Sequence, residues 1–360
     1  MNPLKSGYFQ TIIYPSPTTI LINDEIYGEH LITEPVLLDL LHSPHVLRLA
    51  QIDQHGVTGV LALLPNITRL EHSIGAFLLV RTQGASLPEQ VAALLHDISH
   101  TVFSHVIDWA LSAPGEDSFH EVHKDRYVRG MTGLPGIIRR HGLDPEEVLR
   151  EELFPLVEQP APRLCADRVD YALRDTVALG KLSLTRARGV LKSLRAVPDA
   201  RDPQRILALE DADIALEFSR AYIAADAALW GNSAHGDMYR RLAGVIRNVI
   251  RQGLIQEEAL WTLSDRQFWD LMRSVASEED RGVLDGLERE GIPDEEGLPF
   301  GAGAKIRTID PDILVSNSGS DAEIVPLSRV LPAWATEREE YIRGRERMRA
   351  ISAEGESCSS

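Results

Sequence analysis

The chain has 360 residues, of which 44% are hydrophobic and 25% charged, and its formal net charge at pH 7 is −17. This length is sufficient for one large core or two modest domains, and the composition is that of an ordinary globular protein. The negative charge argues against an extended nucleic-acid-binding surface, because duplex binding needs many phosphate contacts from Lys and Arg. It leaves room for a small basic pocket that holds one nucleotide.

The number of cysteines and the length of the apolar runs indicate the cellular compartment. The two cysteines, Cys165 and Cys358, are too few for a disulfide framework and fit a reducing environment. No run approaches the roughly 18 apolar residues of a membrane-spanning helix, and the N-terminus lacks the apolar segment of a signal peptide. We therefore expect a cytoplasmic protein without a membrane partner.

In chain order, the apolar spacing changes early from strand-like to helical. Residues 8–32 carry the β-rich strings TIIY and TILI between turn signals, which predicts a small hairpin. The spacing over 88–113 predicts one continuous amphipathic helix, and further long helices are expected over 210–229 and 236–253. The string KIRTIDPDILV, at 305–315, is typical of a strand that pairs with one nearby.

This pattern predicts a mainly α-helical protein in four parts. An N-terminal β-rich segment (1–34) precedes a helical catalytic domain (35–196). A Pro/Asp-rich loop at 197–204 marks a boundary, after which a C-terminal lobe of helices and a strand covers 205–344. The remaining polar tail, 345–360, is expected to be disordered.

The adjacent pair His96 and Asp97, in LLHDISHTVFSH, is the most informative feature. A lone His-Asp pair is more often a helix terminus or a surface pair. Here it follows the apolar string VAALL, where a buried charge needs a partner such as a metal ion. His72 in TRLEHSIG and an aspartate of CADRVDYALRD, either Asp167 or Asp170, could complete a site. Two imidazoles and two carboxylates suit one divalent metal, which would activate water and polarise a phosphoryl oxygen.

The flanking strings carry a resemblance. LHSPHVLRLAQIDQHG, TRLEHSIGAFLLV, HDISHTVFSHVID, FHEVH and ADRVDYALRD resemble, in order and spacing, the HD-domain superfamily of metal-dependent phosphohydrolases. More narrowly they resemble its deoxynucleoside triphosphate triphosphohydrolase branch. The resemblance implies an HD helical core with a small accessory β-hairpin or strands and a helical C-terminal lobe. It also implies one divalent metal ion (Mn, Fe, Ni, Zn or Mg), a nucleotide substrate and a homo-oligomer.

The same resemblance assigns the metal ligands. It makes His72, His96, Asp97 and Asp167 the four ligands, because the family's metal aspartate stands three residues before an Asp-Tyr pair. Asp170 then becomes a supporting carboxylate.

Substrate contacts are expected on two helices. The resemblance makes Arg69 a phosphate contact, a role that suits a guanidinium fork because it matches phosphate oxygens. Arg168, Tyr171 and Asp175 lie at i, i+3 and i+7 and so share one face. The resemblance places them at phosphate, at the sugar-phosphate region and at the sugar 3′-hydroxyl, and it brings Gln54 to the sugar. The alternative is a solvated face with Tyr171 packed in the core.

A histidine-rich stretch follows the metal motif. His100, His105 and Asp108 come directly after it, and His120 lies beyond a loop. Resembling enzymes place histidines around the phosphates, and imidazole transfers protons readily near neutral pH. We expect His120 or His105 to be the general acid and His100 to contact phosphate. His55 departs from the family pattern, in which an apolar residue meets the base or sugar.

The expected reaction is attack of water at the α-phosphorus of a deoxynucleoside triphosphate, which releases triphosphate and a deoxynucleoside. One alternative is a nucleotide monophosphatase or cyclic-nucleotide phosphodiesterase on the same metal site. Another is a regulatory protein that senses nucleotides with little turnover. The four metal ligands and the Arg-Tyr-Asp face favour the enzyme.

Overall fold

A computed structural model of the chain describes residues 2–113, 115–300, 305–315 and 323–357. The N-terminal segment forms a four-stranded antiparallel sheet in the order β1-β2-β3-β4. Its strands are β1 (Leu4–Ser6), β2 (Thr11–Pro15), β3 (Ile20–Asp24) and β4 (Gly28–Ile32). Alternate residues of β3 are buried, as expected for a strand with one face on the core.

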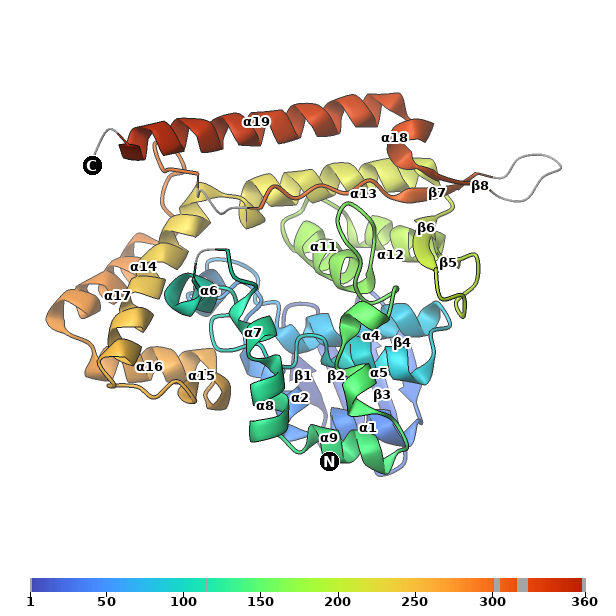
Figure 1. The fold of residues 1–360 in the computed structure, drawn as a ribbon, viewed down its shortest axis with the longest axis horizontal. Helices are drawn as coiled ribbons and strands as arrows, with labels where there is room; N and C mark the ends of the chain where they lie inside the picture. Colours follow the sequence, from blue (N-terminus) through green and yellow to red (C-terminus); the bar gives the residue numbers. More distant parts are fainter. Residues whose placement is uncertain (1, 114, 301–304, 316–322, 358–360) are drawn as a thin grey trace.

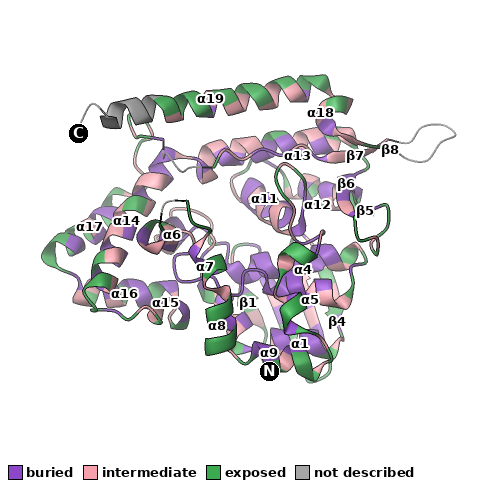
Figure 2. Cartoon of the chain, in the orientation of Figure 1, coloured by how far each residue is buried: buried purple, intermediate pink, exposed green. Residues whose placement is uncertain are grey.

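A helical region follows the sheet and holds the candidate site. Its elements are α1 (Pro35–Leu41), α2 (Pro44–Leu47), η1 (Arg48–Gln51), α3 (Val57–Val60), α4 (Arg69–Thr82), α5 (Leu87–Leu95), α6 (Val106–Leu111), α7 (Phe119–Val122), α8 (Lys124–Met131), α9 (Leu134–Arg140), α10 (Pro145–Val148), η2 (Glu151–Leu153), α11 (Ala166–Ala178) and α12 (Leu184–Ser193). Helix α4 packs against both α5 and α11. Because it is surrounded, every residue from Arg69 to Val80 is buried, and Figure 2 shows the helix in purple.

The continuous helix predicted over 88–113 is interrupted at the centre of the motif. Helix α5 ends at Leu95 and α6 begins at Val106, and between them Phe103 and Ser104 have φ values of 56° and 49°. The amide of Phe103 donates to the Asp265 carboxylate (2.8 Å) and that of Val102 to a carbonyl of the C-terminal half (2.9 Å). These tertiary hydrogen bonds replace the hydrogen bonds of a continuous helix, so the apolar periodicity does not determine the backbone conformation of this segment.

The rest of the chain combines helices with a second sheet. Its elements are β5 (Leu194–Val197), β6 (Ile206–Leu209), α13 (Ala212–Ala225), the π-helical turn η3 (Asp226–Trp230), α14 (Ser233–Arg251), α15 (Ala259–Thr262), α16 (Asp265–Val275), α17 (Glu278–Glu290), β7 (Asp312–Val315), β8 (Glu323–Pro326), α18 (Leu327–Val330) and α19 (Pro332–Ser357). The tail expected to be disordered is thus helical as far as Ser357. Within the described residues, no helix combines the length and apolar character needed to span a bilayer.

The second sheet has the order β5-β6-β7-β8, with β6 and β7 parallel and the other pairs antiparallel. The predicted fold class, a helical protein with only a small accessory hairpin or strands, is therefore wrong in its sheet content, since there are two four-stranded sheets. Short apolar runs such as those of β5 and β6 cannot be told from helix segments by periodicity. The parallel partner of β7, strand β6, also lies about a hundred residues earlier in the chain, beyond the reach of local patterns.

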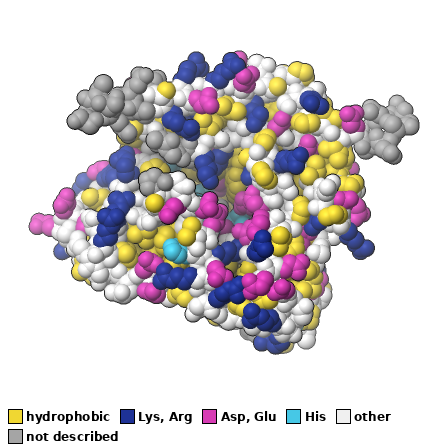
Figure 3. Space-filling view, in the orientation of Figure 1, with side chains coloured by type: hydrophobic (Ala, Val, Ile, Leu, Met, Phe, Trp, Pro, Cys, Tyr) yellow, Lys and Arg dark blue, Asp and Glu magenta, His cyan; other side chains and the backbone are white. Residues whose placement is uncertain are grey.

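Figure 1 shows how these parts surround the site. Helices α4, α5 and α11 lie with the N-terminal sheet, while α14 to α17 form a separate projection on the left. Helix α19 runs along α13 at the top, and the extended segment before β7 passes alongside α13. The space-filling view is hollowed near the middle of this face, between α6 and α11, with basic and acidic side chains around the opening (Figure 3).

Candidate metal centre and active site

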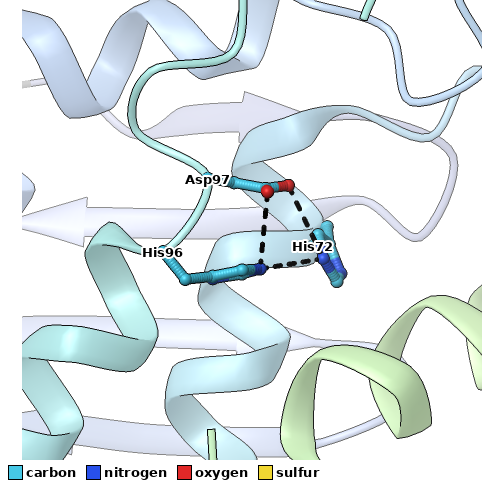
Figure 4. Close-up of side chains that lie close together, drawn as sticks. All are labelled: His72, His96 and Asp97. Carbon is cyan, nitrogen blue, oxygen red and sulfur yellow. Dashed lines mark hydrogen bonds and ion pairs between the residues drawn. The ribbon is translucent and has the colours of Figure 1, made fainter. Parts of the chain in front are cut away.

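Four side chains from three segments converge on one point. His72 comes from the first turn of α4, His96 and Asp97 follow the end of α5, and Asp167 starts α11. Nε2 of His72 lies 3.1 Å from Nε2 of His96, 3.0 Å from Oδ1 of Asp167 and 3.6 Å from Oδ2 of Asp97. Figure 4 shows three of these side chains pointing toward one another.

These separations fit a single ion. Ligand atoms held at about 2.1 Å from a divalent metal are roughly 3.0 Å apart in octahedral and 3.4 Å apart in tetrahedral geometry. The other pairs agree: Nε2 of His96 is 3.6 Å from Oδ1 of Asp167 and 3.7 Å from Oδ1 of Asp97. His72, His96 and Asp97 are also buried, which keeps competing water out.

The outer nitrogens of the imidazoles fix which nitrogen faces the centre. Nδ1 of His96 donates to the carbonyl of Ala93 (2.8 Å), and Nδ1 of His72 donates to Oδ2 of Asp170 (2.8 Å). Each Nε2 then carries the lone pair that a metal needs, in the carboxylate–histidine–metal arrangement typical of such sites.

The carboxylates around His72 favour a bound cation. Burial lowers the pKa of His72, but hydrogen bonds to Asp167 and Asp170 and the charge of Asp97 raise it to about 10. A buried imidazole with so high a pKa is surrounded by a surplus of negative over positive charge. A divalent metal would displace the proton and neutralise that surplus.

Behind His72 lies a buried ionic network that reaches the N-terminal sheet. Asp170 accepts from Nε of Arg174 (3.0 Å), and Arg174 also binds Asp24 at the end of β3 (3.0 Å). A Cβ atom at Gly75 of α4 would lie 1.8 Å from Oδ1 of Asp170, so only glycine allows this approach of α4 to α11.

The network gives a first prediction. Asp170→Asn removes the carboxylate that orients His72, and outer-shell partners of this kind are worth roughly 10- to 100-fold in metal affinity. Metal titration of the purified variant should show weaker binding in that range. Asp167→Asn, as a matched change at a predicted ligand, should bind metal much less still. If Asp170→Asn empties the centre and Asp167→Asn does not, the ligand assignment is reversed.

Arg69 lies beside the centre and is partly engaged. Its NH1 donates to Oδ2 of Asp97 (2.6 Å), and its Nε donates to Oγ of Ser104 (3.0 Å). Ser104 in turn donates to the carbonyl of Asp53 (2.6 Å). The buried NH2 finds no hydrogen-bond partner among the described residues, so it is a donor available to an oxyanion.

The histidine cluster flanks the other side of Asp97. The rings of His100 and His120 are stacked with centroids 3.6 Å apart, and Nε2 of His100 is 3.3 Å from Oδ1 of Asp97. Burial lowers the pKa of both His100 and His120 well below the usual range. His105 is different, since its side chain is 44% exposed and its Nδ1 lies 2.9 Å from Oδ2 of Asp108.

The predicted substrate face of α11 is already hydrogen-bonded. The hydroxyl of Tyr171 lies 2.5 Å from that of Tyr222, and its ring centroid is 6.4 Å from that of His72. Asp175 accepts from the indole of Trp230 (2.6 Å) and lies 3.1 Å from Nε2 of His55.

Arg168 is hydrogen-bonded to the backbone of the segment before α11. Its NH1 donates to the carbonyls of Gln159 (3.0 Å) and Arg163 (2.6 Å), and its NH2 lies 3.6 Å from Oε1 of Glu158. The side-chain oxygen Oε1 of Gln54, the residue expected to contact the sugar, is buried and has no hydrogen-bond partner within the described part of the chain.

Comparisons with known proteins agree with this geometry. The HD domain family matches residues 69–172, which contain all four convergent side chains. The metal-dependent phosphohydrolase cns2 of Cordyceps militaris is 53% identical over 343 residues, which cover 95% of this chain and 98% of that protein. The chain belongs to the HD-domain metal-dependent phosphohydrolases.

Two further similarities are more distant. Human deoxynucleoside triphosphate triphosphohydrolase SAMHD1 is 30% identical over 181 residues, which cover 43% of this phosphohydrolase and 28% of SAMHD1. The crystal structure of a phosphohydrolase from Bacteroides thetaiotaomicron superposes with a TM-score of 0.58 at 18% identity, and covers 86% of this chain and 94% of that one. The latter shows that the fold is shared.

The family and its need for a metal, both predicted from the sequence, are thus confirmed, while the metal's identity is open. Four residues that shape the site were not predicted from the sequence: Ser104, Glu158, Tyr222 and Trp230. Ser104 stands within the HDISHTVFSHVID string without an expected role there, whereas the other three lie outside the motifs and are positioned by packing.

Proposed function

We propose that this phosphohydrolase converts deoxynucleoside triphosphates to deoxynucleosides and triphosphate. The observation that carries the proposal is the layout of α11, where Asp167 lies at the metal centre and Tyr171 and Asp175 follow along the helix. Eight residues of helix span roughly 12 Å, so one helix runs from the reacting phosphorus to the nucleoside. The similarity to SAMHD1 supports the same substrate class.

In this proposal the two sides of the centre have different tasks. A bound metal would lower the pKa of a water molecule and polarise the phosphoryl oxygen. Arg69 would donate through its free NH2 to the phosphate, a charge-assisted hydrogen bond. Stacked His100 and His120, kept neutral by burial, would donate without adding charge.

We assign the general acid to His105, not to His120. The Asp108 carboxylate, 2.9 Å from Nδ1 of His105, orients the ring, and the exposed ring can exchange protons with solvent. His120 is a poor proton carrier because burial lowers its pKa well below the usual range. The proton would pass from Nε2 of His105 to the leaving oxygen.

A second candidate, a nucleotide monophosphatase or phosphodiesterase, is favoured by the contacts of Arg168. Its guanidinium is held by backbone carbonyls, and Asp175 is held by Trp230 and His55. Arg168 and Asp175 are therefore already hydrogen-bonded, whereas the triphosphohydrolase function needs Arg168 to bind the phosphate chain and Asp175 to bind the sugar.

A nucleotide panel with product analysis separates the two functions. We expect metal-loaded protein to release intact triphosphate and deoxynucleoside from deoxynucleoside triphosphates, without orthophosphate in the first step. His105→Ala should lower turnover by roughly 10²- to 10⁴-fold, the usual contribution of acid–base catalysis, with metal content unchanged. Orthophosphate released from monophosphates, with triphosphates untouched, would support the second candidate instead.

A further inference from the structure

A basic segment of the C-terminal lobe lies beside the aromatic side of the active site. Residues 305–311 are extended, precede β7 and run alongside α13 (Figure 1). They carry Lys305 and Arg307, two cations in a chain whose net charge is −17. The segment is anchored by the amide of Asp310, which donates to the carbonyl of Pro162 just before α11 (3.1 Å).

Arg307 lies next to the aromatic side of the site. Its NH1 is 3.4 Å from the carbonyl of Trp230, whose indole donates to Asp175. The Trp230 ring also packs at 5.1 Å from the ring of Tyr171, edge to face. Arg307 is thus connected through Trp230 to Tyr171, the residue of α11 expected at the sugar-phosphate region.

The guanidinium of Arg307 is only loosely engaged. Its backbone amide donates to Oδ2 of buried Asp226 (3.3 Å), and this bond fixes the chain. NH1 lies 3.8 Å from Oδ1 of Asp226, beyond hydrogen-bond distance, and the side chain is 33% exposed. Asp226 is also bound by the hydroxyl of Tyr341 (2.8 Å). Arg307 therefore keeps donors for a ligand.

Two guanidiniums from different parts of the chain act on the same hydroxyl pair. Burial raises the pKa of Tyr222 to about 12, and both Arg168 and Arg307 oppose that rise. Lys305 has a similar position toward α7, where it opposes the rise that burial causes in the pKa of Glu121.

We propose that Arg307 is a phosphate-binding residue that the C-terminal lobe supplies to the active site, and that it holds the outer phosphates of a nucleoside polyphosphate. The inference rests on the proposed function for the identity of the substrate. It would explain how a polyphosphate is held although Arg168 is turned toward backbone carbonyls. The planar fork of arginine suits two phosphate oxygens at once.

The test compares anions that differ in length. Binding of inorganic triphosphate and orthophosphate to the metal-loaded protein would be measured by calorimetry for wild type, Arg307→Ala and Arg307→Lys. We expect Arg307→Ala to bind triphosphate about 10- to 100-fold more weakly and orthophosphate within about threefold of wild type. Arg307→Lys should recover part of the loss. Arg220→Ala, which removes an exposed arginine paired with Glu337, is the control and should change neither.

Kinetics add a readout that a merely structural role would not move. With deoxynucleoside triphosphates, Arg307→Ala should raise KM by a similar factor and leave kcat nearly unchanged. Unchanged triphosphate binding, or equal losses for triphosphate and orthophosphate, would overturn the inference. If triphosphate binding falls as expected but no nucleoside triphosphate is hydrolysed, the inference stands and the proposed function fails. Should Arg307→Ala not fold, Arg307→Gln carries the same comparison.

Discussion

Replacing Asp97 with alanine should empty the metal centre and lower turnover by roughly a thousandfold or more. A metal's stabilisation of transition-state charge is worth several kcal/mol, and each 1.36 kcal/mol is a factor of ten in rate. Asp97 contacts both the histidines of the metal centre and the arginine proposed to bind phosphate, since it lies near His72 and His96 and binds Arg69. Its loss therefore removes a ligand and releases the arginine together.

Elemental analysis and turnover with saturating metal would be measured on the same preparations. Asp125→Ala is a suitable control, because Asp125 is 75% exposed and forms an ion pair with Arg129 of the same helix, remote from the metal ligands in sequence. The control should keep wild-type metal content and rate. Equal metal content in wild type and Asp97→Ala would contradict the assigned centre.

The convergence of the four candidate metal ligands was the most predictable feature of the protein. His72, His96, Asp97 and Asp167 stand in strings whose residue types and order are tied to one kind of chemistry, and the structure brings all four together. The supporting role expected for Asp170 also agrees with its hydrogen bond to His72. A reaction that needs particular residue types at a fixed spacing produces short motifs that can be recognised in the sequence.

The substrate face was less predictable. Arg168, Tyr171 and Asp175 share one side of α11, as their spacing indicated, but Tyr171 and Asp175 already have partners from distant segments and Arg168 binds carbonyls just before the helix. Those partners, such as Tyr222 and Trp230, come from the region of α13, and tertiary packing decides their positions. Helical spacing predicts which side chains share a face, and does not predict what will cover that face.

The backbone shows the same limit. A helical pattern continues through 96–105, yet the loop there is held by the Asp265 carboxylate, which binds the amides of Asp53 and Phe103. The second sheet likewise joins β6 to β7 across about a hundred residues. Both depend on contacts distant in sequence, which outweigh local propensity.

The second large effect is on stability. Arg174→Leu should destabilise the protein by about 3–5 kcal/mol, the usual cost of removing one partner of a buried ion pair. The Arg174 side chain is fully buried between Asp170 and Asp24, which are also fully buried, and it lies over the ring of Phe9. Without the guanidinium, two carboxylates remain without a cation in the core.

Urea denaturation would measure the loss, with Arg186→Leu, which removes an arginine that pairs with Glu217 at the surface, as the control. The triple variant Arg174→Leu, Asp24→Asn, Asp170→Asn should recover part of the stability, since the stranded charges are gone. A loss below about 1 kcal/mol, the level of a surface pair, would show that the network contributes little.

The same pair sets a dependence on pH. Burial raises the pKa of Asp24, but Arg174 and the hydroxyl of Thr11 lower it, so that it ends below its usual value. A carboxyl group whose pKa is depressed by folding contributes stability that is fully present above the unfolded pKa, about 3.9, and is lost as the pH falls through the folded value. Wild-type stability should therefore decline below about pH 4, more steeply than that of the triple variant. Equal slopes in acid would show that Asp24 is not held ionised by Arg174.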